Sequence, residues 1–116
     1  MNKLIIASLL INIAVLIPVC SGLITNANWI EQAYGISTQS RGIVLSIYVA
    51  ILLTSILLMF YPDPKLVAAL LLVQVIYKIT TPITVGTMDN PVVISNLFIA
   101  AFHILTLISI WKSLKF

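Results

Sequence analysis

Residues 66–85 read LVAALLLVQVIYKITTPITV, an apolar stretch that carries Gln74 and Lys78 in its interior. A helix needs about 20 predominantly apolar residues to cross the hydrocarbon core of a bilayer. This stretch is long enough, yet a lysine inside such a run is costly because its charge must leave water. The stretch therefore predicts a membrane-spanning helix, and its lysine requires a particular environment.

The composition of the whole chain agrees with a membrane protein. The chain has 116 residues, of which 61% are hydrophobic and 8% are charged. A soluble domain has about 25% charged residues, so this chain could not cover its own surface in water. We expect a single integral membrane domain over residues 1–116. The net charge is +3, but the basic residues do not gather with aromatic residues on a polar face, so no nucleic acid partner is expected.

Four apolar segments predict four membrane spans, at residues 4–25, 42–60, 66–85 and 91–111. Short connections make neighbouring helices antiparallel, and lipid confines irregular backbone to the membrane surfaces. The fold class is therefore all-α: an integral membrane four-helix bundle with up-down-up-down topology.

The longest polar stretch is the outward loop at residues 26–41. Residues 27–34 are expected to form a short helix at the membrane interface, and Gly35 to end it. Trp29, Tyr34 and Trp111 are predicted to anchor at headgroup depth, as tryptophan and tyrosine commonly do.

Helix starts are also predicted from local chemistry. The second span should be capped by a hydroxyl side chain, and Pro64 suits the first turn of the third span. An Asn-Pro pair at residues 90–91 is a good start for the fourth span. The candidates for the hydroxyl cap are Ser37, Thr38 and Ser40.

The basic residues set the expected orientation. The N-terminus, the second loop and the C-terminus carry Lys3, Lys65, Lys112 and Lys115, whereas the opposite loops carry only Arg41. The positive-inside rule then puts both termini in the cytoplasm of a multi-pass cell membrane protein. The alternative for the first span is a cleaved signal peptide, but three further spans favour an uncleaved helix.

Polar residues from all four spans are predicted to lie in one middle layer. At 1.5 Å of rise per residue, Asn12, Gln74 and His103 lie roughly 12–14 Å above the inner surface, and Lys78 and Tyr48 roughly 18 Å. Helical spacing also puts Gln74 and Lys78 on one face, and Asn96 and His103 on another.

Each of these residues has a structural and a functional interpretation. In the structural interpretation, Asn12 and Gln74 form hydrogen bonds between helices, and His103 is a structural histidine whose ring nitrogens have partners. Tyr48 and Tyr77 then only fill space in the apolar core. Lys78 either extends along its stem to the outer surface or faces inward. No Asp or Glu lies inside a span, so an inward Lys78 must be neutral, hydrated, or paired with a ligand or another subunit.

Catalytic and metal-binding patterns are missing from the sequence. We find no nucleophile and base with an orienting third group, and no glycine-rich phosphate loop. One histidine and no carboxylate within a span make a metal site unexpected. Cys20 is the single cysteine, so an internal disulfide is excluded, and we expect it to be a small buried hydrophobe. The chain is therefore not expected to be an enzyme.

The layout resembles the DoxX-like group of small four-helix membrane proteins. The shared features are a first span, an outward loop with the element Tyr34-Gly35-Ile36, an Arg41-Gly42 entry to the second span and a proline-bounded turn before the third. Some members of that group are associated with quinone-linked sulfur oxidation. Small multidrug resistance transporters have similar size, but they use a glutamate in the first span, where this chain has Asn12.

The leading functional hypothesis is a small non-catalytic membrane protein, either an accessory subunit or a binder of a hydrophobic ligand such as a quinone or a lipid. The alternatives are an oligomeric transporter or channel for a small anion, and an assembly subunit of a larger membrane complex. The partners would be the lipid bilayer, further copies of the chain or that complex. The candidate ligand-binding residues are Lys78, Gln74, His103, Tyr48, Asn12, Tyr77 and Asn96.

Overall fold

The computed structural model describes residues 2–86 and 88–114. Over these residues the chain is all-helical, with no strand, and its helices are α1 (Asn2–Thr25), α2 (Asn28–Tyr34), α3 (Gln39–Phe60), α4 (Pro64–Val85) and α5 (Pro91–Leu114). By length and composition, α1, α3, α4 and α5 can each cross a membrane. The predicted all-α class is therefore confirmed, and each of the four predicted apolar segments forms a helix long enough to cross a membrane. Lys115, counted in the predicted orientation, lies outside the described residues.

All four long helices extend beyond the predicted spans. α1 begins at Asn2 instead of residue 4, α3 at Gln39 instead of 42 and α4 at Pro64 instead of 66, and α5 continues to Leu114 instead of 111. The earlier start of α3 has a local cause, because the Thr38 hydroxyl accepts a hydrogen bond from the backbone N–H of Arg41 at 3.3 Å. The predicted outward loop is therefore too long at its end, since residues 39–41 are helical.

The predicted helix ends and starts have the expected chemistry. Gly35 ends α2 at φ +83°, a conformation that glycine adopts without strain, and its N–H donates to the Glu31 carbonyl. Pro64 begins α4, where the Asp63 carboxylate accepts the backbone N–H groups of the first turn. α5 begins at Pro91 as predicted, and the Asn90 side chain accepts from the N–H of residue 92 at 2.8 Å.

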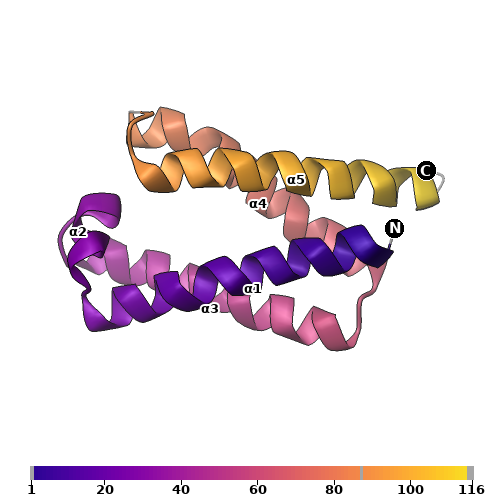
Figure 1. Cartoon of the computed structure of the whole chain (residues 1–116), viewed down its shortest axis with the longest axis horizontal. Helices are drawn as coiled ribbons and strands as arrows, with labels where there is room; N and C mark the ends of the chain where they lie inside the picture. The colour runs from indigo at the N-terminus through magenta and orange to yellow at the C-terminus, as the bar shows by residue number, and fades with distance from the viewer. Residues whose placement is uncertain (1, 87, 115–116) are drawn as a thin grey trace.

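The long helices pack as two pairs. Figure 1 shows α1 lying along α3 and α4 lying along α5, with the two chain ends at one end of the molecule and α2 at the other. A buried apolar cluster near the chain ends includes side chains from all four long helices: Ile5, Leu9, Leu58, Val67, Leu71 and Ile110. The buried members of a second cluster, toward α2, come only from α1, α2 and α3. The pairs therefore join firmly at one end and separate toward α2.

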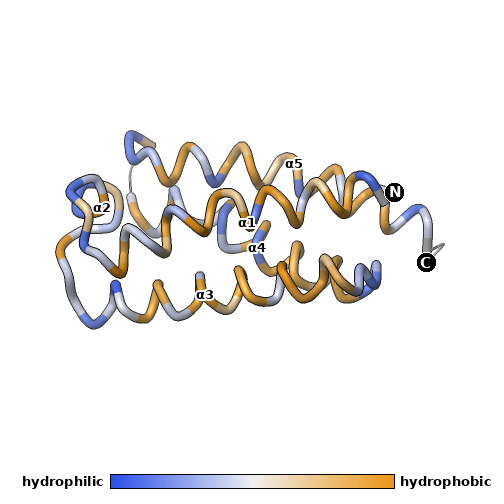
Figure 2. Tube along the Cα trace, turned by 60° about the horizontal axis from the view of Figure 1, so that its bottom comes forward, coloured by the Kyte–Doolittle hydropathy of each residue, from blue (hydrophilic) through white to orange (hydrophobic). Residues whose placement is uncertain are grey.

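The outer surfaces of the long helices are apolar. Side chains such as Leu57, Ile83 and Phe98 are 68%, 79% and 75% exposed. Figure 2 shows hydrophobic colouring along the four long helices and hydrophilic residues mainly at their ends and around α2. Exposed apolar surface of this extent fits lipid as the surrounding solvent and would be unusual in water.

α2 folds back closely onto α1 at Gly22. A Cβ atom at Gly22 would lie 2.8 Å from a ring carbon of Trp29 and 2.9 Å from side-chain carbons of Ile30. The backbone N–H of Ala27 also donates to the Gly22 carbonyl at 3.0 Å. Ile30 is fully buried, so it has little room to move. A glycine at this position therefore lets α2 cover the end of the bundle.

We expect Gly22→Leu to destabilise the protein by about 1–3 kcal/mol, because overpacking forces α2 off α1. Gly42→Leu is the matched control, since a Cβ at Gly42 meets no atom within 4 Å. Unfolding in mixed micelles measures both variants. Equal stability of the two variants would contradict the close packing of α2 on Gly22.

Candidate functional site

A hydrogen-bonded network joins α1, α3 and α5 in the interior. His103 contacts two residues of α1: its Nε2 lies 3.1 Å from Asn12 Oδ1, and its Nδ1 lies 3.1 Å from Ser8 Oγ. Asn12 Nδ2 donates to Ser55 Oγ at 3.1 Å, and the hydroxyls of Ser8 and Thr106 lie 2.7 Å apart. All five residues are buried.

The partners determine the protonation of His103. The Asn12 amide donates to Ser55, so its oxygen faces His103 and can only accept; Nε2 therefore carries the proton. In the neutral ring, Nδ1 then accepts from the Ser8 hydroxyl, which also lies 2.7 Å from the Thr106 hydroxyl. Both ring nitrogens thus have partners within the protein. These contacts fit the structural interpretation of His103, and its binding of a ligand stays a prediction.

Lys78 lies inside the bundle and does not extend to the surface. The side chain is 6% exposed, and its Nζ donates to Asn96 Oδ1 at 3.2 Å. The same nitrogen lies 4.9 Å from the centroid of the Tyr77 ring, a favourable position for a cation over an aromatic face. The interaction joins α4 to α5. Of the two predicted orientations of Lys78, the structure has the inward one.

Gln74 is buried one turn before Lys78, but its amide is incompletely satisfied. The residue is 1% exposed, and Nε2 is buried without a hydrogen-bond partner among the described residues. The sequence suggested that Gln74 forms a hydrogen bond between helices, and its amide nitrogen forms none among the described residues.

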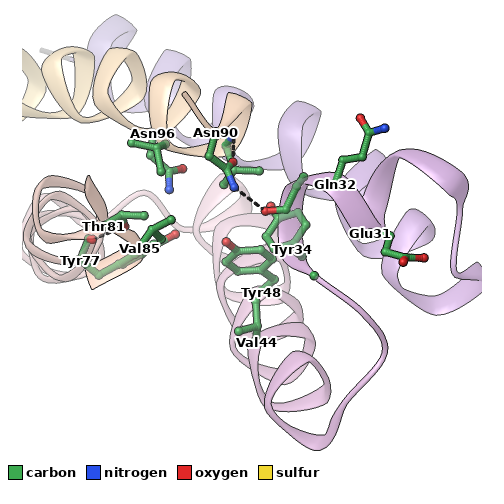
Figure 3. Close-up of a pocket in the computed structure, with 14 residues that line it drawn as sticks. Glu31, Gln32, Tyr34, Val44, Tyr48, Tyr77, Thr81, Val85, Asn90 and Asn96 are labelled. Atoms are coloured by element: carbon green, nitrogen blue, oxygen red, sulfur yellow. Dashed lines mark hydrogen bonds between the residues drawn. The ribbon is translucent and has the colours of Figure 1, made fainter. Parts of the chain in front are cut away.

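A cavity of about 430 Å³ lies near the end of the bundle covered by α2 (Figure 3). It is partly open, and its lining residues come mainly from α2, α3, α4 and α5. Of these helices, α3 and α4 make little contact with each other. Its lining combines aliphatic walls with hydroxyl and amide groups. The polar and aromatic lining side chains directed toward its centre include Tyr34, Tyr48, Tyr77, Thr81 and Asn96.

The predicted ligand-binding residues divide into three groups around this cavity. Tyr48, Tyr77 and Asn96 line it. Lys78 lies directly behind the wall, because it contacts both Asn96 and Tyr77. The remaining three are not among the lining residues and lie deeper in the bundle: Asn12, Gln74 and His103. The polar residues that were predicted to form a single layer therefore belong to two groups. Asn12 and His103 belong to a network that joins helices, and Tyr48, Tyr77 and Asn96 form a wall of the cavity.

Tyr34 contributes to the cavity although it was predicted only as an interface anchor. Its ring centroid lies 5.9 Å from that of Tyr48, with the rings nearly perpendicular at 76°. Burial raises the pKa of the Tyr34 phenol, and the neighbouring Tyr48 raises it further, so this hydroxyl stays neutral. Trp29 and Trp111 are 48% and 62% exposed, and their anchoring in a membrane interface stays a prediction.

Hydrogen bonds from the side chains of Asn90 and Arg41 fix α2 over the cavity. Asn90 Nδ2 donates to the Ala33 carbonyl at 2.9 Å and so ties α2 to the start of α5. Arg41 is buried, and its guanidinium donates to the Gly35 carbonyl at 3.0 Å and to Asn26 Oδ1 at 2.8 Å. These bonds hold the loops on both sides of α2, so α2 acts as a fixed cover of the cavity.

A second, smaller cavity of about 250 Å³ lies on the other side of α2, between α1 and α5. It shares part of its lining with the first cavity, including Tyr34 and Asn96. The two helix pairs are therefore hollowed on both faces where they separate, and these shared side chains form part of the wall between the two hollows.

Several contributing residues lacked a sequence signal of their own. Ser8 lies one turn before Asn12, and Thr106 lies three residues after His103, so helical spacing from the predicted residues could have found both. Thr81 follows Tyr77 by four residues in the same way. Tyr34 belongs to a short helix outside the spans, where no periodicity relates it to the cavity.

Comparisons with protein-family models, curated proteins and solved structures found no match. Among the described residues, no three histidine, cysteine or acidic side chains lie close enough together to hold a metal ion. The side chains of the candidate site are therefore what indicates its chemistry.

We expect Asn12→Leu and His103→Leu each to destabilise the protein, because each substitution removes a buried hydrogen-bond partner of the other residue. The double variant should lose less than the sum, with a coupling of about 0.5–1.5 kcal/mol. The free energies of unfolding of the four proteins in mixed micelles give this double-mutant cycle. Leu105→Ala, at an exposed position, is the control for a change on the outer surface. Strict additivity would contradict the Asn12–His103 bond.

Proposed function

We propose that this protein is a non-catalytic membrane protein that binds a lipid-soluble ligand with an oxygen-containing polar head, a lipid or a quinone, in the cavity beneath α2. The observation that carries the proposal is the cavity wall formed by Tyr48, Tyr77 and Asn96, with Lys78 hydrogen-bonded behind it. Hydroxyl and amide groups suit a polar head, and the aliphatic lining suits a chain or ring.

The size and position of the cavity support this proposal. Ligand pockets commonly measure about 300–1,000 Å³ and combine apolar walls with a few polar groups. At about 430 Å³, this cavity falls within that range, and two of the helices that line it, α3 and α4, are apolar enough to cross a membrane. We propose that a ligand dissolved in the bilayer enters between them, past the lining side chains Val44 of α3 and Val85 of α4.

The candidate residues then have separate roles. Tyr48, Tyr77 and Asn96 contact the ligand, and Lys78 orients Asn96 through their hydrogen bond. Asn12 and His103 hold α1 against α5. Gln74 keeps a free amide nitrogen in the interior and has no assigned contact with the ligand.

We further propose an orientation in the cell membrane, with up-down-up-down topology and both termini in the cytoplasm. Its support is the excess of lysines at the termini and the second loop over the single Arg41 on the opposite side. In a Cys20→Ala background, Ser37→Cys should react with an impermeant maleimide in intact cells, and Lys65→Cys only after permeabilisation. The reverse pattern would contradict this orientation. Membership of the DoxX-like group stays a prediction.

The other functions expected from the sequence have less support. Anion transport would need Lys78 along the path, and Lys78 lines neither of the two cavities described above. Flux of a small anion into liposomes holding only this protein tests that alternative. The role of an accessory or assembly subunit predicts a partner that remains bound after purification.

Two neighbouring threonines provide a matched test of the binding site. Thr81 lines the cavity, whereas Thr80 is exposed and lies outside the lining. Thr81→Phe fills the cavity, so we expect it to weaken binding by about tenfold or more, a loss of about 1.4 kcal/mol. Thr80→Phe should bind like the wild type.

The measurement is binding in nanodiscs of three probes: a pyrene-labelled alkyl phosphate, its neutral dimethyl ester, and a short-chain ubiquinone. At least one probe should bind saturably to the wild type. The proposal fails if none binds, or if Thr80→Phe and Thr81→Phe reduce binding equally.

A further inference from the structure

Lys78 brings a potential positive charge into the bundle without a carboxylate beside it. The three acidic residues of the chain are Glu31, Asp63 and Asp89, and all lie outside the four long helices. The hydrogen bond that Nζ makes is to a neutral amide oxygen at 3.2 Å, and the Tyr77 ring adds only partial negative charge. A buried charge is costly unless it is paired. Negative charge is therefore what this part of the bundle lacks.

The cavity next to Lys78 presents hydroxyl and amide groups that can donate hydrogen bonds to a ligand. The Asn96 oxygen is occupied by Lys78, so the N–H groups of the same amide remain for a ligand. Figure 3 shows this amide directed into the space between Tyr77 and Tyr48. The Asn90 amide nitrogen is already bound to the Ala33 carbonyl.

Among the described residues, the one carboxylate that borders this cavity does not oppose an anion there. Glu31 belongs to α2, and Figure 3 shows its carboxylate directed away from the tyrosines. The polar groups in the interior of the cavity are therefore neutral hydroxyls and amides, with a lysine behind them.

We propose that the ligand of this cavity carries an oxyanion head, a carboxylate or a phosphate, on an apolar chain. This inference rests on the proposed function and narrows its ligand class. The head accepts hydrogen bonds from the Asn96 amide and the hydroxyls of Tyr48 and Tyr77, and its charge faces Lys78. The chain leaves between α3 and α4 past Val44 and Val85. A free fatty acid and an anionic phospholipid share this chemistry.

The test compares an anion with its neutral twin on the full chain in phosphatidylcholine nanodiscs. The probes are the pyrene-labelled alkyl phosphate and its dimethyl ester. The wild type should prefer the phosphate by about tenfold or more, because a hydrogen bond to a charged group is much stronger than one to a neutral group. This comparison does not depend on the folding of any variant.

Substitutions of lysine then show whether Lys78 causes the preference for the phosphate over the ester. Lys78→Met should bring the ratio of the two affinities close to one while the ester still binds. Lys78→Arg should keep the preference, and so should Lys65→Met, which removes an exposed lysine of the same helix. Competition against the labelled phosphate by unlabelled fatty acid and by phosphatidylglycerol distinguishes a free fatty acid from an anionic phospholipid as the ligand. Displacement of the probe by either competitor supports a ligand with an oxyanion head.

Three results would overturn the inference: equal affinity of the wild type for phosphate and ester, a preference that survives Lys78→Met, or displacement by ubiquinone as effective as by either anion. If phosphate and ester bind equally, and both are lost in Thr81→Phe, the cavity still binds a lipid-soluble ligand and only the oxyanion class fails. If no probe binds, the proposed function fails too.

Discussion

The hydrogen bond from Lys78 to Asn96 is the interaction on which the polar wall of the cavity depends. A lysine among apolar helices has no water to solvate it, so the protein must supply acceptors or the side chain must reach the surface. Here Nζ meets an amide oxygen at 3.2 Å and an aromatic face, both from within the bundle. The bond fixes α4 against α5 and orients the Asn96 amide toward the cavity. Its partners are neutral, which leaves the charge incompletely compensated.

The two groups of polar residues have different consequences for the fold. Asn12, His103 and their hydroxyl partners form a closed network, in which each amide and ring nitrogen has a partner. Such bonds join helices that lipid alone does not drive together. The wall made by Tyr48, Tyr77 and Asn96 instead faces a hollow where the helix pairs separate. One group thus stabilises the bundle, and the other presents polar groups to whatever enters it.

Much of the fold followed from the sequence, because long apolar segments and helix caps are local features. The four spans, the short α2, the turn at Gly35 and the start at Pro64 were all predicted. Depth along each helix was predictable as well, but the pairing of helices was not, since it depends on how side chains pack at each rotation. For that reason His103 and Lys78 were placed in one layer, although they belong to separate groups. Tyr34 was missed as a cavity residue because its position depends on how α2 folds over the bundle.

Solid-state NMR in bilayers tests directly whether Asn96 holds Lys78 inside the bundle. With ¹⁵N at the Lys78 side chain and ¹³C at the Asn96 carboxamide, we expect a measurable dipolar coupling between the two nuclei, because Nζ lies 3.2 Å from Oδ1. We also expect slow exchange of the Lys78 protons with water. A Lys78 nitrogen that shows no coupling to Asn96 and whose protons exchange rapidly, or that contacts lipid phosphates, would contradict this position of Lys78.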